Sequence, residues 1–403
     1  MMFVGAMSLA CGDDGPAATT EVESSSGDPS TSSTSVVADA SSSSGAADSS
    51  TTVVDPDSGP VTTCGDGVSQ PGEVCFLDAA AFDVGLTPSD VILVDLQGDG
   101  AIDLVTADVG DDGHSILLGD GQGGFAEPLT LPGGVGTRGV AAGHLDQDGV
   151  LDLAGANPSV DYVAVYYGDG MGGFTDQEPL AAGTGPRAVA IADLDADGAG
   201  DLLVVGELSE DLTVLRGDGR GGFGPAEVYP VGAVPYDLAV ADLDADGSLD
   251  VAVVNEGDDT LSILRGQGDG TLVADEPLAV GGSPRGVAIG DADVDGNADV
   301  VTAEFDDDRI SLLFGDGRGG LDDPQGVVAG MEPYAVAIVD VTADDVPEIL
   351  VVRRGSAELA IYVRLGNMAY DLQGVYILAL NPLALAVGHL DDDGVPDISV
   401  QEG

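Results

Sequence analysis

Acidic residues recur in one motif, D-x-D-x-D-G-x-x-D, that could hold a cation. It begins at positions spaced 49 residues apart: Asp95, His144, Asp193, Asp242, Asp291, Asp340 and His389. Calcium prefers six to eight oxygen ligands at flexible geometry. A tight loop supplies them from positions 1, 3, 5 and 9 and from the carbonyl of position 7, while glycine at position 6 permits the sharp turn. The motif therefore predicts calcium loops in the repeats.

The predicted ligand sets differ in completeness. The complete sets are Asp193, Asp195, Asp197 and Asp201; Asp242, Asp244, Asp246 and Asp250; and Asp291, Asp293, Asp295 and Asp299. The first loop includes one amide oxygen and consists of Asp95, Gln97, Asp99 and Asp103. The second and seventh begin with imidazole, a poor calcium ligand, so the acids carry these sites: His144 with Asp146, Asp148 and Asp152, and His389 with Asp391, Asp393 and Asp397. The sixth loop, from Asp340 to Glu348, has Asp345 in place of glycine, and we expect weak or no binding there.

Two other interpretations of this motif fit the sequence less well. An EF-hand needs flanking helices and a glutamate at position 12, whereas glycine-bounded, strand-like segments flank these loops. Carboxylates that only made turns would repel one another without a cation. We therefore expect about five or six structural Ca²⁺ ions, each fixing a turn and cancelling local charge.

The elements that carry these loops are predicted to be strands. An apolar run such as 187–192 precedes each loop, and further strands are expected at 201–205, 212–216 and 223–231. A second motif, G-D-G-x-G-G-F, has the same period and begins at Gly119, Gly168 and Gly217, with weaker copies from Gly266 and Gly315. Four strands in a repeat of about 40 to 50 residues are typical of one β-propeller blade.

The repeats resemble FG-GAP or VCBS repeats, which form the blades of the integrin α-subunit propeller and of many bacterial surface proteins. The two motifs quoted above carry the resemblance, which extends over residues 76–403. It implies an all-β, seven-bladed β-propeller. In each blade the acidic loop would join the first and second strands and hold one Ca²⁺.

Closure of the ring is the open point of this topology. Residues 76–82 match the outer strand of a blade whose inner strands, 383–389 and 397–401, lie at the C-terminus. We expect both ends of the chain to share this seventh blade, with residues 61–64 as its third strand. A seventh blade of three strands and a truncated chain are the alternatives.

The charge of the chain excludes some partners. It has 72 acidic and 11 basic residues, all of the latter arginine, for a net charge of -61. Such a surface repels phosphate, which excludes nucleic acid and anionic membrane surfaces as partners. Because 43% of the residues are hydrophobic, a buried core is still expected. No apolar run reaches the length of roughly 18 residues that a membrane helix needs.

The N-terminal region predicts a surface location. Residues 1–11 end in Ser8-Leu9-Ala10-Cys11, which resembles a bacterial lipoprotein signal with Cys11 lipidated, although no basic residue precedes it. Residues 12–60 are rich in Ser and Thr and predict a disordered linker. In segment 61–75, Cys64 and Cys75 could form a disulfide in an oxidising compartment. We therefore expect an extracellular or outer-membrane lipoprotein, held at the membrane only through its lipid. An ordinary N-terminus without a signal is the alternative.

One position at the start of each inner strand carries residues suited to ligand binding. It is occupied by Ser89, Arg138, Arg187, Tyr236, Arg285, Tyr334 and Leu383. The integrin resemblance implies that these positions lie near the central channel, on the face opposite the calcium loops. Arg138, Arg187, Tyr236, Arg285 and Tyr334 could hold an anionic or aromatic ligand. Alternatively, the arginines pair with neighbouring acidic loops and the tyrosines pack on proline.

Sequence signals for catalysis are few. No nucleophile elbow, zinc-protease motif or phosphate loop is present, and we expect His114 to be a solvated loop residue. We therefore predict that the chain is not an enzyme. We expect a calcium-stabilised extracellular binding or adhesion module on a surface stalk, with a protein or glycan ligand. The alternatives are a carbohydrate-binding lectin, which the absence of Trp disfavours, and a polysaccharide-acting enzyme or its accessory domain.

Overall fold

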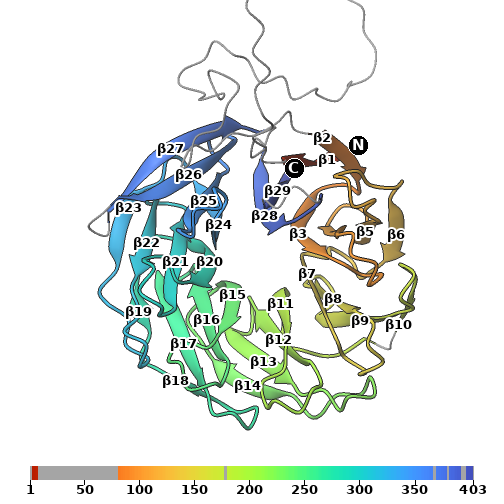
Figure 1. Cartoon of the computed structure of the whole chain (residues 1–403). Helices are drawn as coiled ribbons and strands as arrows, with labels where there is room; N and C mark the ends of the chain where they lie inside the picture. The colour runs from red at the N-terminus through yellow and green to blue at the C-terminus, as the bar shows by residue number, and fades with distance from the viewer. Residues whose placement is uncertain are drawn as a thin grey trace, which may run out of the picture.

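The computed structural model describes residues 2–7, 80–176, 179–365, 369–378, 381–391 and 396–402. Their strands form seven sheets, which are arranged as blades around a central channel (Figure 1). The prediction of an all-β propeller is thereby confirmed. The described residues contain no helix, and hence none that is long and apolar enough to cross a membrane.

Each blade has an inner, second, third and outer strand. The inner strands are β3 (Pro88–Val94), β7 (Gly139–Gly143), β11 (Pro186–Ala192), β15 (Pro235–Ala241), β20 (Pro284–Gly290), β24 (Pro333–Val339) and β28 (Pro382–Gly388). The second strands are β4 (Asp103–Asp108), β8 (Asp152–Asn157), β12 (Asp201–Gly206), β16 (Asp250–Asn255), β21 (Asp299–Glu304), β25 (Glu348–Arg353) and β29 (Asp397–Glu402).

The outer half of each blade is less regular. The third strands are β5 (Gly113–Leu117), β9 (Tyr162–Gly168), β13 (Asp211–Leu215), β17 (Thr260–Gly266), β22 (Arg309–Leu313), β26 (Glu358–Leu365) and β1 (Met2–Met7). The outer strands are β6 (Leu129–Pro132), β10 (Phe174–Asp176), β14 (Glu227–Pro230), β18 (Leu272–Ala274), β23 (Gln325–Val328), β27 (Ala369–Ile377) and β2 (Ala80–Val84), and the short β19 (Leu278–Ala279) also pairs with β17.

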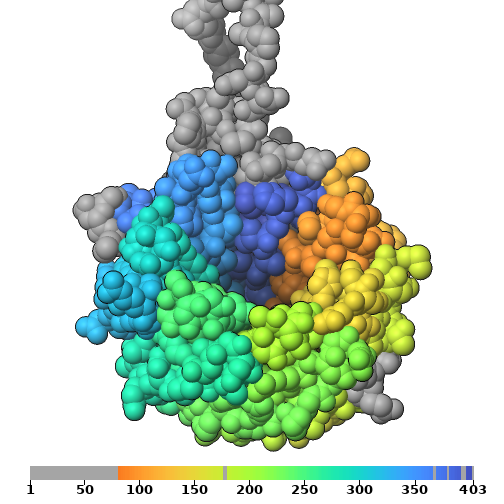
Figure 2. Space-filling view, turned by 60° about the horizontal axis from the view of Figure 1, so that its bottom comes forward, coloured from red at the N-terminus to blue at the C-terminus, as the bar shows by residue number. Residues whose placement is uncertain are grey.

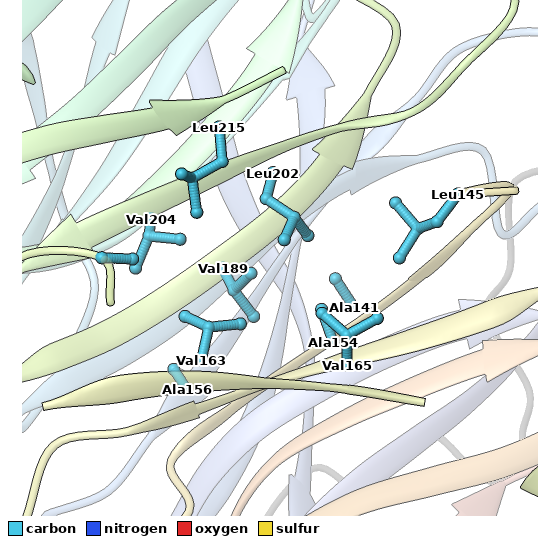
Figure 3. Packing of buried hydrophobic residues seen from close by; sticks show 11 residues of the cluster. Ala141, Leu145, Ala154, Ala156, Val163, Val165, Val189, Leu202, Val204 and Leu215 are labelled. Atoms are coloured by element: carbon cyan, nitrogen blue, oxygen red, sulfur yellow. The ribbon is translucent and has the colours of Figure 1, made fainter. Parts of the chain in front are cut away.

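The hydrophobic core lies between neighbouring blades. Every residue of β12 is buried, because a second strand is covered on both faces by adjacent sheets. In Figure 3, Val163 and Val165 of β9 pack against Val189 of β11 and Val204 of β12, so two blades share one cluster. Small and β-branched side chains therefore let the sheets approach closely around the ring.

The two ends of the chain close the ring in one sheet, in the order β2-β1-β29-β28. Strand β1 lies between its neighbours, with Val4 opposite both Phe82 and Gln401. The third strand is thus Met2–Met7, and the expectation that residues 61–64 fill this position is corrected. The strand also falls inside the segment 1–11 expected as a signal. Cys11, Cys64, Cys75 and the predicted linker lie outside the described residues.

A β-bulge at the start of the inner strands directs particular side chains toward the channel. In the third blade, Pro186 pairs with Gly206 and Ala188 pairs with Val205. Arg187 is therefore an extra residue with no residue opposite it in β12. The same register shift occurs in β3, β15, β20, β24 and β28, where the extra residues are Ser89, Tyr236, Arg285, Tyr334 and Leu383. A bulge changes the direction of the side chain of its extra residue. This side chain therefore points in a different direction from those of the regularly paired residues of the strand.

Candidate ion-binding loops and central channel

The acidic loops join the inner strand of each blade to its second strand, as predicted. In the third blade Asp193 shapes the loop, because its two carboxylate oxygens accept hydrogen bonds from the backbone N–H groups of Asp197 (3.1 Å) and Gly198 (2.8 Å). Gly198 has φ +88°, which a residue with a side chain adopts only with strain. The first acid of the motif therefore fixes the turn on which the other acids stand.

Three loops bring their acids together. The clustered carboxylates belong to Asp193, Asp195 and Asp197; Asp242, Asp244 and Asp246; and Asp291, Asp293 and Asp295, with ligand oxygens within 4.8 Å of one another in each group. These are the loops with complete predicted sets. Oxygen donors at this spacing fit a hard divalent cation such as Ca²⁺. The carboxylates could hold one ion per cluster, which would supply the positive charge that relieves their repulsion.

The acid at position 9 is buried and binds backbone groups of two turns. Asp201 lies outside the cluster and is buried, and its oxygens accept hydrogen bonds from the N–H groups of Leu194 (2.9 Å) and Gly217 (2.9 Å). It thereby ties the acidic loop to the glycine-rich turn of the same blade. The equivalent residues Asp103, Asp152, Asp250 and Asp299 make the same pair of bonds. Burial, together with the neighbouring Asp293, raises the pKa of Asp299 to about 6.

The remaining predicted loops do not form such clusters among the described residues. In the first loop, Asp95 accepts hydrogen bonds from the N–H groups of Gly98 and Gly100, at 2.7 and 2.8 Å. In the second, Nδ1 of His144 lies 2.8 Å from the carbonyl oxygen of Val150, the position 7 oxygen that was expected to bind calcium. The acids of these two loops, Asp99, Asp146 and Asp148 among them, form no group of three converging acidic or histidine side chains, and Gln97 adds an amide oxygen to the first loop.

The sixth and seventh loops depart most from the complete motif. Asp340 accepts hydrogen bonds from the N–H groups of Asp344 and Asp345, and Asp345 adopts φ +65° where other loops have glycine. In the seventh loop, Asp391 and Asp397 are described, whereas Asp393 lies outside the described residues. The turn therefore survives in the sixth blade even though its acids are depleted.

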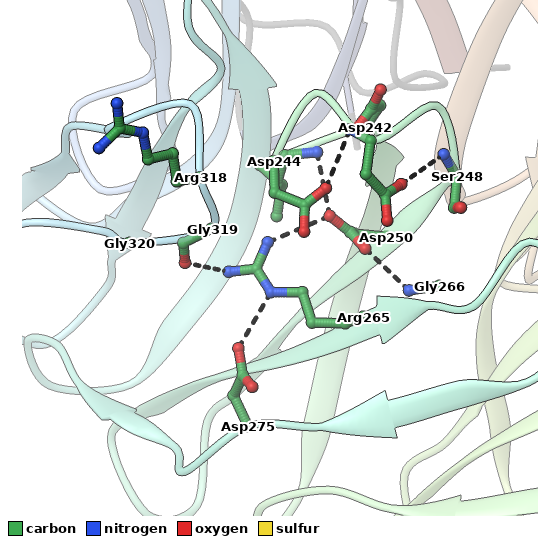
Figure 4. A network of polar contacts seen from close by, with 12 residues as sticks. Asp242, Asp244, Ser248, Asp250, Arg265, Gly266, Asp275, Arg318, Gly319 and Gly320 are labelled. Atoms are coloured by element: carbon green, nitrogen blue, oxygen red, sulfur yellow. Dashed lines mark hydrogen bonds and ion pairs between the residues drawn. The ribbon is translucent and has the colours of Figure 1, made fainter.

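Arg265 carries a positive charge to the fourth acidic loop (Figure 4). Its guanidinium forms ion pairs with Asp250 (3.1 Å) and Asp275 (3.0 Å) and donates a hydrogen bond to the carbonyl of Gly319 (2.5 Å) in the next blade. Arg216 reaches the next blade in the same way, through a 2.8 Å bond to the carbonyl of Asp269. Side chains at the end of the third strand therefore link successive blades.

The central channel opens into a cavity of about 690 Å³, and the ring is hollowed at its centre in Figure 2. The predicted residues Arg138, Arg187, Tyr236, Arg285 and Tyr334 all line this cavity. The structure therefore brings the five candidate ligand-binding residues together.

Two of these arginines are held by acids of neighbouring loops. Arg187 forms an ion pair with Glu207 at 3.0 Å, and its guanidinium carbon lies 3.3 Å from the centre of the Tyr236 ring. Arg285 pairs with Glu256 at 2.5 Å and lies 3.6 Å from the Phe305 ring centre. Cation–π contacts and ion pairs thus fix both guanidinium groups in the cavity wall. The alternative weighed from the sequence, pairing with acidic loops, holds for these two residues.

Arg138 and Arg354 have more freedom. Both line the cavity, and among the described residues neither forms an ion pair with a carboxylate. Arg138 is exposed, and Arg354 lies 5.9 Å from the Phe305 ring centre. Arg354 follows the second strand β25, so its place in the cavity could not be inferred from the start of an inner strand. These two guanidinium groups can meet an incoming anion.

Two carboxyl groups in the cavity were missed by the sequence analysis. Asp90 and Asp237 immediately follow the bulged residues of β3 and β15. Burial raises the pKa of Asp90 to about 7, with a contribution from the negative charge of Asp237, and burial raises the pKa of Asp237 to about 6. The repeat could have revealed these two acids, because the same position is Gly or Ala in the other five blades.

The expectation that His114 is a solvated loop residue is wrong. His114 lies in β5 and is fully buried, with its ring 5.6 Å from that of Tyr166 and Nδ1 3.2 Å from the carbonyl oxygen of Thr106. Burial lowers its pKa to about 4, so the imidazole is neutral at physiological pH.

The blades and their acidic loops define a β-propeller built from one repeated unit with potential metal sites. The chain belongs to the family described as FG-GAP-like repeat, whose sequence model matches residues 95–154, 144–204, 193–253 and 242–302. These overlapping matches extend from residue 95 to residue 302, about half of the chain. No curated protein matches the chain.

Solved structures share the fold at low sequence identity. BBS1N in complex with ARL6DN is 17% identical, with a TM-score of 0.54, 79% of this chain and 94% of that chain being covered. A putative 6-phosphogluconolactonase from Bacteroides fragilis is 16% identical, with a TM-score of 0.60 and coverage of 78% and 89%. The periplasmic gluconolactonase PpgL of Pseudomonas aeruginosa is 17% identical, with a TM-score of 0.55 and coverage of 76% and 92%. At this identity the likeness shows the fold alone.

The prediction that the chain is not an enzyme is corrected by these neighbours. Proteins described as lactonases have the same fold, so a propeller of this kind is compatible with catalysis. Familiar catalytic motifs are not found in the sequence, but the blades bring two carboxyl groups, those of Asp90 and Asp237, into the channel.

Proposed function

We propose that this protein is a calcium-stabilised binding module whose central channel takes an anionic ligand. The observation that carries the proposal is the group of guanidinium groups in the channel cavity: Arg138, Arg187, Arg285 and Arg354. They are four of the 11 basic residues in a chain of net charge -61. Such a concentration at one concave site supports selection of a negative group.

The negative surface does not prevent anion binding at this site. Charges further away than the Debye length, about 8 Å at physiological ionic strength, are largely screened. A ligand carboxylate or sulfate in direct contact with Arg138 and Arg354 would instead form charge-assisted hydrogen bonds in a partly enclosed cavity. Arg187 and Arg285, already held by Glu207 and Glu256, would orient the remaining polar groups.

Calcium would act at a distance from the ligand, as a structural element. The clusters around Asp195, Asp244 and Asp293 support three sites, and an ion in each would fix the turn between an inner strand and its neighbour. We place the module outside the cell, where millimolar calcium occurs. The Ser- and Thr-rich residues 12–60 and the pair Cys64 and Cys75 support this location.

The proposal is tested by calorimetric titration of the calcium-loaded chain with sodium sulfate, an acetylated tri-glutamate peptide and a glucuronosyl-glucose disaccharide. At least one of these probes should bind. The double variant Arg138→Gln/Arg354→Gln should weaken that binding more than 10-fold. Arg318→Gln, an exposed arginine in a glycine-rich turn outside the cavity, is the matched control and should bind normally. The proposal fails if no probe binds or if both variants behave alike.

A second candidate function is catalysis in the same channel. The pKa values of Asp90 and Asp237, raised to about 7 and about 6, suit groups that exchange protons near neutral pH. Lactone hydrolysis is the first reaction to assay, since lactonases are among the proteins of this fold. Turnover of gluconolactone that is lost in Asp90→Asn would support it, and a rate equal to that in buffer would exclude this substrate.

A further inference from the structure

The channel wall carries both positively and negatively charged side chains. Where the start of an inner strand carries a charge, that charge is of one sign only. Where the residue at the start of the inner strand is arginine, the next residue is Gly or Ala: Arg138-Gly139, Arg187-Ala188 and Arg285-Gly286. Where the next residue is acidic, the bulged residue is neutral, as in Ser89-Asp90 and Tyr236-Asp237. Acids and arginines therefore start different inner strands and are interspersed around the ring, with Asp237 on the blade between those of Arg187 and Arg285.

Backbone groups hold both acids in position. The oxygens of Asp90 accept hydrogen bonds from the N–H groups of Val91 (2.9 Å) and Val140 (3.0 Å), the latter in the next blade. Asp237 repeats this arrangement with Leu238 (2.9 Å) and Val287 (3.2 Å). Each oxygen accepts one backbone bond, although a carboxylate oxygen can accept two. Among the described residues no arginine forms an ion pair with either acid, so each retains capacity for a ligand.

The combination limits the chemistry of the ligand. A small inorganic anion would satisfy the guanidinium groups but leave the remaining hydrogen-bonding capacity of the acids unused, and its volume is small compared with a cavity of about 690 Å³. A simple cation would be repelled by the guanidinium groups of Arg138 and Arg354, which no carboxylate pairs with among the described residues. A ligand that carries both an anionic group and hydroxyl groups can satisfy the arginines and the acids.

Hydroxyl groups match these acids better than an ammonium group does. An ammonium group needs an ionised carboxylate beside it, whereas burial raises the pKa of Asp90 to about 7 and so favours its neutral form. A carboxyl group that is sometimes protonated can both donate and accept hydrogen bonds, as a sugar hydroxyl does. The cavity also lies within the range of small-molecule sites, roughly 300 to 1,000 Å³.

We propose that the channel recognises an acidic saccharide, with the uronate carboxylate bound by Arg138 and Arg354 and sugar hydroxyls bound by Asp90 and Asp237. This inference rests on the proposed function, since it requires that an anion binds in the channel. It adds the substrate class and the two residues that distinguish a sugar acid from other anions.

The test compares a β-1,4-linked glucuronosyl-glucose disaccharide with cellobiose, in which a hydroxymethyl group replaces the carboxylate, and with sulfate and the tri-glutamate peptide. Calorimetry on the calcium-loaded full chain should give at least 10-fold tighter binding of the acidic disaccharide than of the other three probes. Asp90→Asn and Asp237→Asn should each weaken disaccharide binding about 10-fold without weakening sulfate binding. Asp323→Asn, an exposed acid outside the cavity, is the control of equal charge change.

The outcomes separate the two proposals. If sulfate or the peptide binds as tightly as the acidic disaccharide, the saccharide inference is overturned while anion binding in the channel stands. If no anion binds, both are overturned. If the Asp variants do not fold, as judged by thermal unfolding, the selectivity of the unaltered protein among the four probes still decides between these results.

Discussion

The acid at position 9 of each loop shows that one motif can combine two roles. Asp195 belongs to a carboxylate cluster, whereas Asp201 accepts two backbone hydrogen bonds from otherwise separate turns. Both residues are aspartates of the same motif, and only the geometry distinguishes them. One should respond to calcium and the other should not.

Asparagine at position 9 should therefore destabilise the fold whether or not calcium is present. Asp201→Asn keeps one oxygen acceptor and presents an NH₂ group to the second N–H, which should lower the free energy of unfolding by about 3 kcal/mol. Asp195→Asn should lower it only in calcium. Urea unfolding in calcium and in excess chelator measures both effects. Equal losses for the two variants in calcium, and none in chelator, would show that Asp201 acts as a ligand alone.

The buried imidazole of His114 should make the fold sensitive to acid. Its folded pKa of about 4 is below the unfolded value of 6.5, so the unfolded chain binds more protons between these pH values. Stability from this residue is complete above pH 6.5 and is lost as the pH falls toward 4, by up to about 3 kcal/mol. His114→Phe should remove this part of the pH dependence. Urea unfolding in saturating calcium gives the free energy of unfolding of the parent and the variant at pH 7 and at pH 5. If the difference between the two proteins is the same at both pH values, the prediction is wrong.

At the scale of the element, the second acidic loop is a natural comparison for its neighbours. It keeps Asp146, Asp148 and Asp152, but the ring of His144 approaches the carbonyl that would face an ion. The imidazole therefore closes this turn through its contact with a backbone carbonyl oxygen. The sequence indicated a poor calcium ligand here, whereas the hydrogen bond to Val150 depends on the fold.

Aspartate at this position should create an additional metal site. His144→Asp restores the residue set of the third loop and removes the contact with Val150, so one more Ca²⁺ should bind per chain. Equilibrium dialysis with metal analysis gives the number of ions for the parent and the variant. His114→Phe, a change of a histidine that lies in β5 and outside the acidic loops, serves as the control. An unchanged ion count would show that loop 2 cannot converge on a cation.

At the scale of the whole molecule, the repeat period predicts much of the fold. Positions 49 residues apart locate the blades, the acidic loops and the channel residues Arg187 and Arg285. The period cannot predict what differs between blades. Asp90 and Asp237 depart from their equivalents in the repeat, His114 is buried only because of the register of β5, and β1 has no counterpart in the motif. These features depend on packing between blades, which local patterns do not encode.

Calcium should stabilise the whole ring, since the three clusters belong to adjacent blades. At calcium concentrations of about 100 to 1,000 Kd each site adds roughly 3 to 4 kcal/mol. The thermal midpoint should then rise by about 10–20 °C over that in excess chelator. Magnesium at equal concentration, which demands stricter octahedral geometry, is the control. A midpoint that does not respond to calcium would mean that the clusters are not ion sites.

Closure of the ring by β1 can be tested by deletion. A chain that begins at residue 12 lacks the strand between β2 and β29, so two strand edges lose their hydrogen-bonding partners. Its thermal midpoint should be lower and its tendency to associate greater than those of the full chain, as measured by calorimetry and light scattering. Equal behaviour would mean that another segment, such as residues 61–64, takes the place of β1.

The position of β1 beside β2 also determines how the intervening residues 8–79 are tethered. Strands β1 and β2 are hydrogen-bonded neighbours in one sheet, with Ala6 opposite Ala80, so the two points from which this segment departs lie side by side on the same blade. The entropy of closing such a loop grows only with the logarithm of its length, about 0.6 kcal/mol for each doubling. The propeller should therefore accept the insertion of a complete folded domain in this segment with little loss of stability.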